Sequence, residues 1–361
     1  MKLLIQPGDG VDRLVKGIRK AKKTVEIMIF RFDRPEIERA LIDAVERGVA
    51  VYALIAFTNR GGETHLRDLE MRFLANGITV ARTAGDLVRY HGKMMIVDRK
   101  ELYVLSFNFI HLDIDRSRGF GVITRNPKLV AEAVKLFEAD TKRQTYAAGN
   151  SKFLVSPVNA RKELTAFIKG AKKQLMIYDP KISDRAILRA LEDRKKAGVD
   201  IRIIGSVGGK RLNACELARM RLHTRTVIRD RAEAFVGSQS LRQLELDARR
   251  EIGIIFRHAV VKDLVRTFEE DWKASAREQN EDKQAVGIPK KAAKKVAESV
   301  IKTISVGPVA KNVAKAIRKS TNVDIDSKKV RESVKQVVKD VVEQTAKQAA
   351  AETAKALAEG N

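Results

Sequence analysis

Two short segments of the chain carry a histidine and a basic residue at the same two-residue spacing. They are His91-x-Lys93 and His223-x-Arg225. In a β-strand, residues i and i+2 point to the same face, so each imidazole is expected to share a site with a fixed cation. A cation can hold the oxygens of a phosphate while a histidine acts as nucleophile or proton donor. The spacing therefore predicts chemistry on a phosphate group.

The two segments belong to a longer pattern that occurs twice. Positions 132 residues apart match in chemical type, and the pairs are His91 and His223, Asp98 and Asp230, Ser106 and Ser238, and Asn108 and Ser240. Earlier in the chain the offset is 150 residues, as between Gly48 and Gly198. Only five histidines occur, and two of them fall at the same point of the pattern, which argues against incidental histidines. We interpret the sequence as a duplicated unit.

Each copy predicts the same order of secondary structure. Residues 14–49 and 164–199 both read as an amphipathic helix, an apolar strand, a loop, a second helix, a glycine and another apolar strand. Strands that alternate with helices predict an α/β fold with a largely parallel sheet and crossover helices. The predicted domains are residues 1–149 and 150–280, followed by a tail at residues 281–361.

Composition narrows the class of protein. The 361 residues are 44% hydrophobic, enough for a packed core, and they carry a formal net charge of +25. Such a charge attracts nucleic acid, anionic lipid surfaces or phosphorylated substrates without choosing among them. The single cysteine, Cys215, excludes an internal disulfide framework, and no apolar run is long enough to span a membrane. We expect a cytoplasmic protein.

The tail differs in composition from the rest of the chain. Aromatic residues are absent from residues 281–361, and Ala, Lys and Val dominate. A narrow apolar seam runs through Val330, Val334, Val337 and Val341 at three- and four-residue spacing. We expect a basic tail that is helical or partly disordered. It can dock on the core, mediate oligomerisation, or act as an arm that binds lipid or nucleic acid.

The doubled pattern H-x-K-x4-D-x6-G-S-x-N resembles the phospholipase D superfamily, which includes cardiolipin synthases, phosphatidylserine synthases and certain nucleases. The resemblance covers about residues 10–275. It implies two duplicated phospholipase D-like α/β/α domains packed about a pseudo-two-fold axis, with one active site formed by both motifs. In that family one histidine attacks phosphorus to give a phosphohistidine, and the other protonates the leaving oxygen. Water or an alcohol then resolves the intermediate.

The resemblance also implies roles for individual residues. His91 is expected as the nucleophile and His223 as the general acid, although the two roles can be exchanged. The expected catalytic residues are His91, His223, Lys93, Arg225 and Glu251, and the expected phosphate-binding residues are Lys93, Arg225, Asn108, Ser106, Ser238 and Ser240. Asp98 and Asp230 are expected to brace their motifs. No metal and no cofactor is implied, because two cationic side chains supply the charge stabilisation that a metal would give.

The sequence departs from the family pattern at several positions. Arg225 replaces the usual lysine and offers a planar fork instead of a point charge. Leu105 and Ser240 replace the usual glycine and asparagine. The acidic residue that orients a histidine is Glu251 in the second half, but the aligned position in the first half is Gly119. We expect Asp113 or Asp115 to substitute; otherwise that half of the site is weakened.

Three functions fit this pattern. The first is a phosphodiesterase or phosphatidyltransferase that acts on phospholipids and binds peripherally to an anionic membrane. The second is a metal-independent nuclease that uses the same site on DNA or RNA. The third is a weakly active or inactive anion-binding scaffold. Aromatic residues make up only 5% of the chain, which offers few stacking platforms for bases and mildly disfavours sequence-tolerant binding of single strands.

Overall fold

The computed structural model describes residues 1–57, 64–208 and 212–284, together with 307–308, 311–312 and 342. The valine seam and nearly all of the predicted tail lie outside these residues, so the expectations for the tail stay predictions. Met1–Ser275 form one compact unit, which contains both copies of the repeat. Within the described ranges, no helix is both long enough and apolar enough to cross a membrane.

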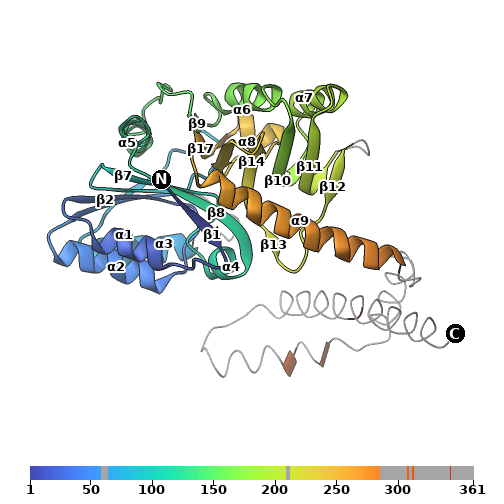
Figure 1. The fold of residues 1–361 in the computed structure, drawn as a ribbon. Coiled ribbons are helices and arrows are strands. Elements are labelled where there is room, and N and C mark those ends of the chain that lie inside the picture. Colours follow the sequence, from blue (N-terminus) through green and yellow to red (C-terminus); the bar gives the residue numbers. More distant parts are fainter. Residues whose placement is uncertain (58–63, 209–211, 285–306, 309–310, 313–341, 343–361) are drawn as a thin grey trace. The chain divides into compact units, whose positions relative to one another are not determined.

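The first half of the chain forms a sheet with helices on its outer face. The strands run in the order β1 (Lys2–Gln6), β8 (Ser117–Thr124), β7 (Glu101–Leu105), β6 (Met94–Val97), β2 (Thr24–Ile29), β3 (Ala50–Ile55) and β4 (Thr79–Arg82). Helices α1 (Asp12–Arg19), α2 (Pro35–Glu46) and α3 (Thr64–Ala75) cover one face (Figure 1). Leu14, Ile37 and Phe73 from these helices are buried against the sheet.

The second half repeats this arrangement. Its sheet has the order β12 (Asn213–Cys215), β11 (Asp200–Val207), β10 (Gln174–Ile182), β14 (Arg225–Arg229), β15 (Glu233–Gly237), β17 (Ile252–Arg257) and β9 (Phe153–Val155). Helices α6 (Ala160–Lys169) and α7 (Arg185–Lys196) cover its outer face (Figure 1). Gly48 and Gly198 follow α2 and α7 with φ angles of 81° and 84°, a conformation that glycine adopts without strain.

The sheets are mixed, and the expectation of a largely parallel sheet was wrong. Pairing is parallel in β2–β3, β3–β4, β10–β11 and β11–β12, and antiparallel between the other neighbours in these two strand orders. Strands β6 and β14, which follow the two histidines, run antiparallel to both neighbours. Three residues join β6 to β7, with positive φ at Asp98 and Arg99. A turn this short reverses the chain, so β6 and β7 pair antiparallel.

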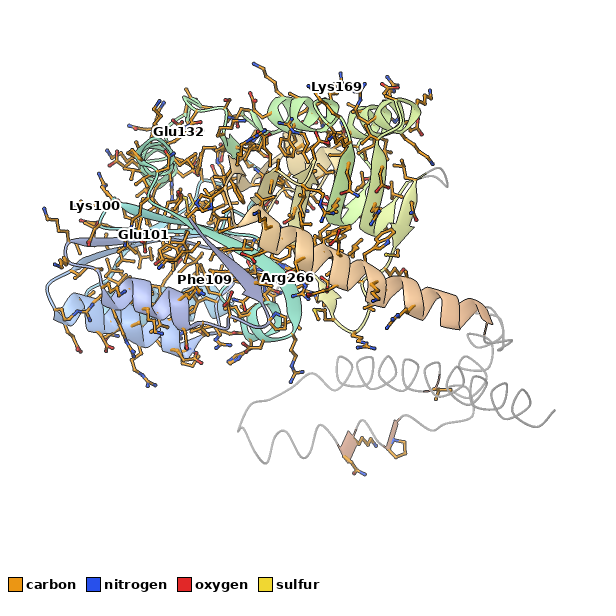
Figure 2. All side chains as sticks on the ribbon, in the orientation of Figure 1. Lys100, Glu101, Phe109, Glu132, Lys169 and Arg266 are labelled. Atoms are coloured by element: carbon orange, nitrogen blue, oxygen red, sulfur yellow. The ribbon has the colours of Figure 1, made fainter. Side chains whose placement is uncertain are left out.

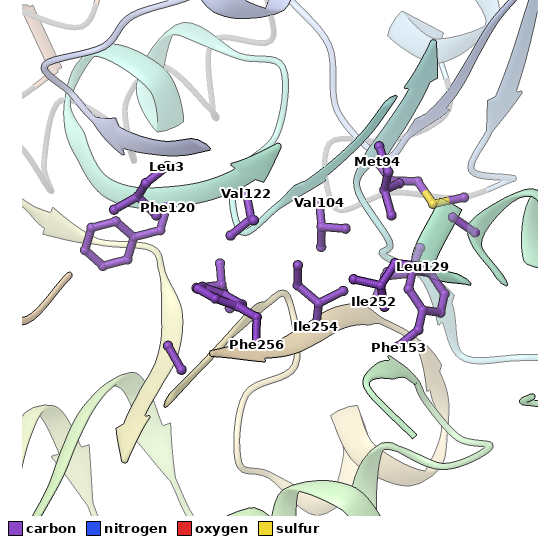
Figure 3. Packing of buried hydrophobic residues seen from close by; sticks show 14 of the residues in the cluster. Leu3, Met94, Val104, Phe120, Val122, Leu129, Phe153, Ile252, Ile254 and Phe256 are labelled. Atoms are coloured by element: carbon purple, nitrogen blue, oxygen red, sulfur yellow. The ribbon is translucent and has the colours of Figure 1, made fainter. Parts of the chain in front are cut away.

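The two sheets pack face to face through a shared apolar core (Figure 3). Phe120 and Val122 of β8 lie opposite Ile254 and Phe256 of β17, and all four side chains are buried. Each buried side chain of this size contributes about 1.5–3 kcal/mol to folding. The two copies therefore share one core, and this packing fixes the position of each half against the other.

Two helices flank the shared core at its edges. They are α5 (Pro127–Thr141) and α9 (Val261–Gln284), which contribute Phe137 and Phe268 to the buried cluster. Glu132 lies on α5 (Figure 2). It accepts hydrogen bonds from the Tyr146 hydroxyl at 2.6 Å and the Gly149 N–H at 2.8 Å, which fixes the connection between the halves to this helix. The predicted division at residues 149 and 150 falls in this connection and stays a prediction.

Candidate active site

Each histidine is held by a strand from the other half of the chain. The strand β5 (Arg89–Tyr90) lies just before His91 and pairs in parallel with β16 (Arg249–Arg250) of the second half. In the same way β13 (Arg221–Leu222), just before His223, pairs with β8 of the first half. The His91 N–H donates to the Arg250 carbonyl at 2.7 Å, and the His223 N–H donates to the Arg118 carbonyl at 3.1 Å. We call these two contacts the crossing strand pairs.

Each histidine consequently faces a carboxylate from the opposite half. His91 Nδ1 lies 2.8 Å from Glu251 Oε2, and both side chains are buried. His223 Nε2 lies 3.4 Å from Asp113 Oδ2, while its Nδ1 is buried without a hydrogen-bond partner in the described part of the chain. The sequence predicts Glu251 as the orienting carboxylate of the second half, and Asp113 or Asp115 as its substitute in the first. The structure instead places Glu251 beside His91 and Asp113 beside His223, because the crossing strand pairs bring each carboxylate to the histidine of the opposite half.

Of the two aspartates expected to substitute at the first half, only Asp113 reaches a histidine of the site. It lies on α4 (His111–Asp115) and is fully buried. Asp115 instead contacts Arg34 and His111. Gly119 packs closely against Phe107, and an added Cβ would stand 3.0 Å from that ring, tighter than most side-chain contacts. The carboxylate of this half is supplied by Asp113 instead.

The two basic residues of the motifs make the same contact. Lys93 Nζ donates to the His91 carbonyl at 2.5 Å, and Arg225 donates through a terminal nitrogen to the His223 carbonyl at 2.6 Å. Lys93 is fully buried, whereas Arg225 is half-buried. Arginine therefore occupies the position of the usual lysine without loss of the contact. Charge interactions reach between the halves, since Arg225 acts on His91 and Lys93 acts on His223.

Burial decides the protonation of the central groups. It lowers the pKa of both His91 and His223 well below the ordinary value, and the neighbouring Lys93 and Arg225 lower it further. Burial also lowers the pKa of Lys93 to about 7, although Glu251 opposes this shift. The pKa of Glu251 is raised by burial. Both histidines are thus neutral near pH 7, and Lys93 is only partly protonated at that pH.

Asp98 and Asp230 lie away from the histidines, at the far ends of β6 and β14. The Asp98 carboxylate accepts backbone N–H groups at residues 22–24, with the shortest bond 2.7 Å. Asp230 accepts the equivalent N–H groups at residues 172–174, also with a shortest bond of 2.7 Å. Each aspartate therefore joins its motif to the start of the neighbouring strand.

The serine and asparagine positions are buried within the protein framework. Ser106 Oγ accepts the Phe120 N–H at 2.9 Å, and Ser238 Oγ accepts the Ile252 N–H at 3.1 Å. Asn108 donates its side-chain amide to Asp113 at 2.6 Å, so it positions the carboxylate that faces His223. Ser240 donates to Asp179 at 2.5 Å. Through these contacts the four polar side chains support the framework of the site.

Several residues near the site were not among the sequence candidates. The Phe30 ring lies edge-on to His91 at 4.5 Å between centroids, and Lys93 Nζ lies 5.3 Å from the same ring. Glu245, on α8 (Gln243–Asp247), is buried and acts on His91 through its charge. The 132-residue offset relates Glu245 to Asp113 and would have identified it. No sequence signal marked Phe30, since Pro180 occupies the equivalent position.

No group of three or more His, Cys, Asp or Glu side chains suited to a metal ion occurs within the residues that the structure describes. Three kinds of ionisable side chain meet at the centre of the site. These are two neutral imidazoles, two cations that face them, and carboxylates that hold one nitrogen of each imidazole.

The fold and the site define a two-histidine α/β protein whose polar centre lies at the junction of two repeats. A family model described as "Cardiolipin synthase, PLD-like domain" matches residues 14–141 and 164–272. These residues are well over half of the chain, and the chain therefore belongs to the phospholipase D superfamily.

Individual relatives agree with this assignment. The chain is 29% identical over 131 residues to a mitochondrial cardiolipin hydrolase of Danio rerio, covering 35% of this chain and 56% of that protein. Among solved structures, the phosphatidylserine synthase of Haemophilus influenzae Rd KW20 aligns with a TM-score of 0.58 at 10% identity, over 76% of this chain and 86% of that one. The polyphosphate kinase of Porphyromonas gingivalis aligns with a TM-score of 0.63 at 18% identity, over 74% and 49%. At these identities the two structures show a shared fold alone.

Proposed function

We propose that this protein is a phospholipase D-type phosphodiesterase that cleaves or transfers the phosphatidyl group of a phospholipid through a phosphohistidine. The observation that carries the proposal is the pairing of each buried histidine with a carboxylate from the opposite half. This arrangement supplies two oriented imidazoles at one site, which is what a double displacement at phosphorus requires. The comparisons with known proteins support the reaction class, and the particular reaction is our proposal.

His91 is the proposed nucleophile. Glu251 holds its Nδ1 at 2.8 Å, so the proton belongs on Nδ1 and the lone pair of Nε2 is left for attack. Because burial lowers the pKa of His91, the ring is neutral and needs no base to activate it. As the Nε2–P bond forms, the bond between phosphorus and the leaving oxygen breaks.

His223 is the proposed acid and base. In the first step it gives a proton to the leaving oxygen; in the second it takes a proton from the water or alcohol that attacks the phosphohistidine. Asp113 stabilises its protonated form, and the negative phosphate raises its pKa when substrate enters. The second attack breaks the N–P bond and returns His91 to its neutral state.

Lys93 and Arg225 are the proposed ligands of the non-bridging phosphate oxygens. Both already stand beside their histidines, and phosphate in the site restores the charge that burial takes from Lys93. Asn108, Ser106, Ser238 and Ser240 were expected to assist, but their contacts lead us to propose supporting roles for them. Asp98 and Asp230 are proposed to fix the far ends of their motifs.

A phospholipid is the proposed substrate because both the matched family and the relative from Danio rerio are named for cardiolipin, which is a phospholipid. The low aromatic content also favours a phospholipid over a single-stranded nucleic acid as substrate. The test compares release of water-soluble headgroups from phospholipid micelles with cleavage of plasmid DNA and of a generic phosphodiester, in the presence of EDTA. His91→Ala and His223→Ala serve as inactive variants, and Arg39→Ala, an exposed change on α2, serves as the control.

We expect headgroup release that resists EDTA and is lost in both histidine variants. Plasmid cleavage without lipid turnover would replace the lipid enzyme with a nuclease. Absence of any hydrolysis by the wild type would leave only the anion-binding scaffold. A labelled phospholipid that carries radioactive phosphorus should leave an acid-labile, base-stable label on the wild type and none on His91→Ala.

A further inference from the structure

A cavity of about 220 Å³ lies against the crossing strand pair of β5 and β16. Tyr90 and Arg250, which are opposite each other in this pair, both line the cavity. Each immediately precedes a residue of the active site, His91 or Glu251. Successive side chains of an extended chain point to opposite faces, so the cavity lies on the reverse side of the strand pair from the active site. No proposed catalytic residue is among the described residues that line it.

An incomplete ion pair forms part of the cavity wall. Arg250 contacts Asp140 Oδ1 through one terminal nitrogen at 3.1 Å, and it donates through the other to the Ser156 carbonyl at 3.2 Å. Asp140 Oδ2 and Arg250 Nε are buried without a hydrogen-bond partner in the described part of the chain. Both side chains are more than nine-tenths buried. Burial of charged groups with unused hydrogen-bonding atoms is unfavourable, so the pair calls for a further polar group.

The second half of the chain shows which group completes such a pair. Arg118, which the 132-residue offset relates to Arg250, donates to Asp271 through Nε at 2.7 Å and through a terminal nitrogen at 2.8 Å. The Tyr178 hydroxyl donates to the same carboxylate at 2.7 Å. The 150-residue offset relates Tyr178 to Met28, which has no hydroxyl. The first half therefore lacks the hydroxyl that satisfies the carboxylate in the second half.

The charged side chains that line the cavity are of both signs. Asp86 and Asp140 supply two carboxylates, and Arg143 and Arg250 supply two guanidinium groups. Asp86 also accepts a hydrogen bond from the Tyr90 hydroxyl at 2.7 Å. Burial raises the pKa of Asp140 to about 6, although Arg250 opposes the shift, so this carboxylate is ionised above about pH 7. The four charges then cancel.

The residues beside Tyr146, another residue of the wall, are balanced as well. Tyr146 donates its hydroxyl to Glu132 at 2.6 Å, and Lys135 Nζ lies 5.8 Å from the centre of its ring. A wall with balanced charges selects neither an anion nor a cation. A hydroxyl suits it better, because one hydroxyl can donate to a carboxylate and accept from a guanidinium at the same time.

The cavity is much larger than a single bridging water needs. One buried water takes up about 10–15 Å³ of such space, so the volume of about 220 Å³ has room for a small organic molecule. It is smaller than the about 300–1,000 Å³ of sites that hold drug-sized ligands. A ligand of the size of one sugar ring agrees with this volume.

We propose that this cavity binds a small uncharged polyhydroxy compound, a cyclic polyol or a single sugar ring, whose hydroxyl completes the Asp140–Arg250 pair. Because Asp140 Oδ2 and Arg250 Nε are covered by neighbouring atoms, binding includes a turn of these two side chains toward the ligand. Further hydroxyls meet Asp86 and Arg143, which are exposed at the rim. This site goes beyond the proposed function and does not depend on it.

The test measures binding of myo-inositol to the full chain by calorimetric titration at about pH 7.5, where Asp140 is ionised. Inorganic phosphate and choline are titrated in parallel as charged probes. Asp140→Asn removes the charged acceptor, and Ala84→Phe adds a ring to the half-buried wall. Asp271→Asn is the matched control, because it makes the same change in the completed pair, and Arg39→Ala is the surface control. Urea midpoints check that each variant is folded.

We expect the wild type to bind one myo-inositol with a Kd on the order of 1 mM, as is usual for a ligand of this size. Asp140→Asn should weaken binding about tenfold, because a neutral hydrogen bond replaces a charge-assisted one. Ala84→Phe should weaken it at least as much by occupying space. Both controls should bind as the wild type does.

Three results would overturn the inference. The first is the absence of saturable myo-inositol binding to the wild type, and the second is tighter binding of phosphate or choline, which would mark a site for an ion. The third concerns the place of binding and uses His223→Ala, which should keep the affinity of the wild type. Affinity that is lost in His223→Ala and kept in Ala84→Phe would place the polyol in the active site.

Discussion

Titration of Lys93 should make kcat/KM depend on pH. Burial lowers the pKa of this ammonium from 10.5 to about 7. Only its charged form can hold a phosphate oxygen, so the free enzyme loses productive sites as pH rises above about 7. At pH 9 about one Lys93 in a hundred remains protonated, and kcat/KM should be about a hundredfold below its value at pH 6.

The assay is hydrolysis of bis(p-nitrophenyl) phosphate between pH 6 and 9.5, corrected for the rate without enzyme. This substrate isolates Lys93, because p-nitrophenolate is a stable anion and leaves without a proton from His223. The profile of kcat/KM reports groups in the free enzyme, and this substrate brings no titrating group of its own. A decline of about tenfold per pH unit above pH 7 is expected.

Two reciprocal variants test the assignment. Lys93→Arg should remove the decline, because guanidinium stays charged over this range, and Arg225 shows that arginine can make the same contact with its histidine carbonyl. Arg225→Lys should keep the decline. A wild-type profile that stays flat to pH 9, or a decline that persists in Lys93→Arg, would refute the reasoning.

Three further predictions concern the histidines and the packing of the halves. His223→Ala should slow cleavage of an alkyl phosphodiester at least a hundredfold more than cleavage of the p-nitrophenyl ester, whereas equal losses would contradict a role as general acid. Tyr178 is buried and donates a hydrogen bond from its hydroxyl to Asp271 at 2.7 Å. Tyr178→Phe should therefore lower the free energy of unfolding, measured by urea titration, by about 1–2 kcal/mol. A change under about 0.5 kcal/mol would contradict this prediction. Because burial lowers the folded-state pKa of His91 and His223, the unfolded chain binds more protons below about pH 6.5, so stability should fall as pH drops through that range. Between pH 7 and pH 5 the urea midpoint should fall further in the wild type than in the double variant with asparagine at both histidines. An equal fall in both proteins would contradict this prediction.

Much of the fold could be predicted from the sequence because duplication leaves a regular record. Gly48 and Gly198 mark equivalent helix ends in the structure, as their 150-residue offset indicated. The α/β class and the two phospholipase D-like units are confirmed. Strand direction around β6 was not predicted correctly, because a three-residue turn carries little apolar pattern and the helix–strand alternation dominated the interpretation.

The sequence also identified the central side chains but not their partners. His91, Lys93, His223 and Arg225 come from two distant segments, and the structure brings them to one junction. Glu251 was predicted as the orienting carboxylate of the second half, yet the structure places it beside the histidine of the first half. Alignment of repeats compares equivalent positions and contains no information about which half each side chain faces.

The sequence alone determined three features of the site: the two motifs, their unequal basic residues, and Gly119 at the position of a carboxylate. Residue types and spacings can be read from it directly. Only the tertiary structure decided that the halves complete one another. The shared core fixes one sheet against the other, and the crossing strand pairs then bring Glu251 to His91 and Asp113 to His223. Those contacts depend on the packing of two surfaces, and packing is a property of the folded chain as a whole.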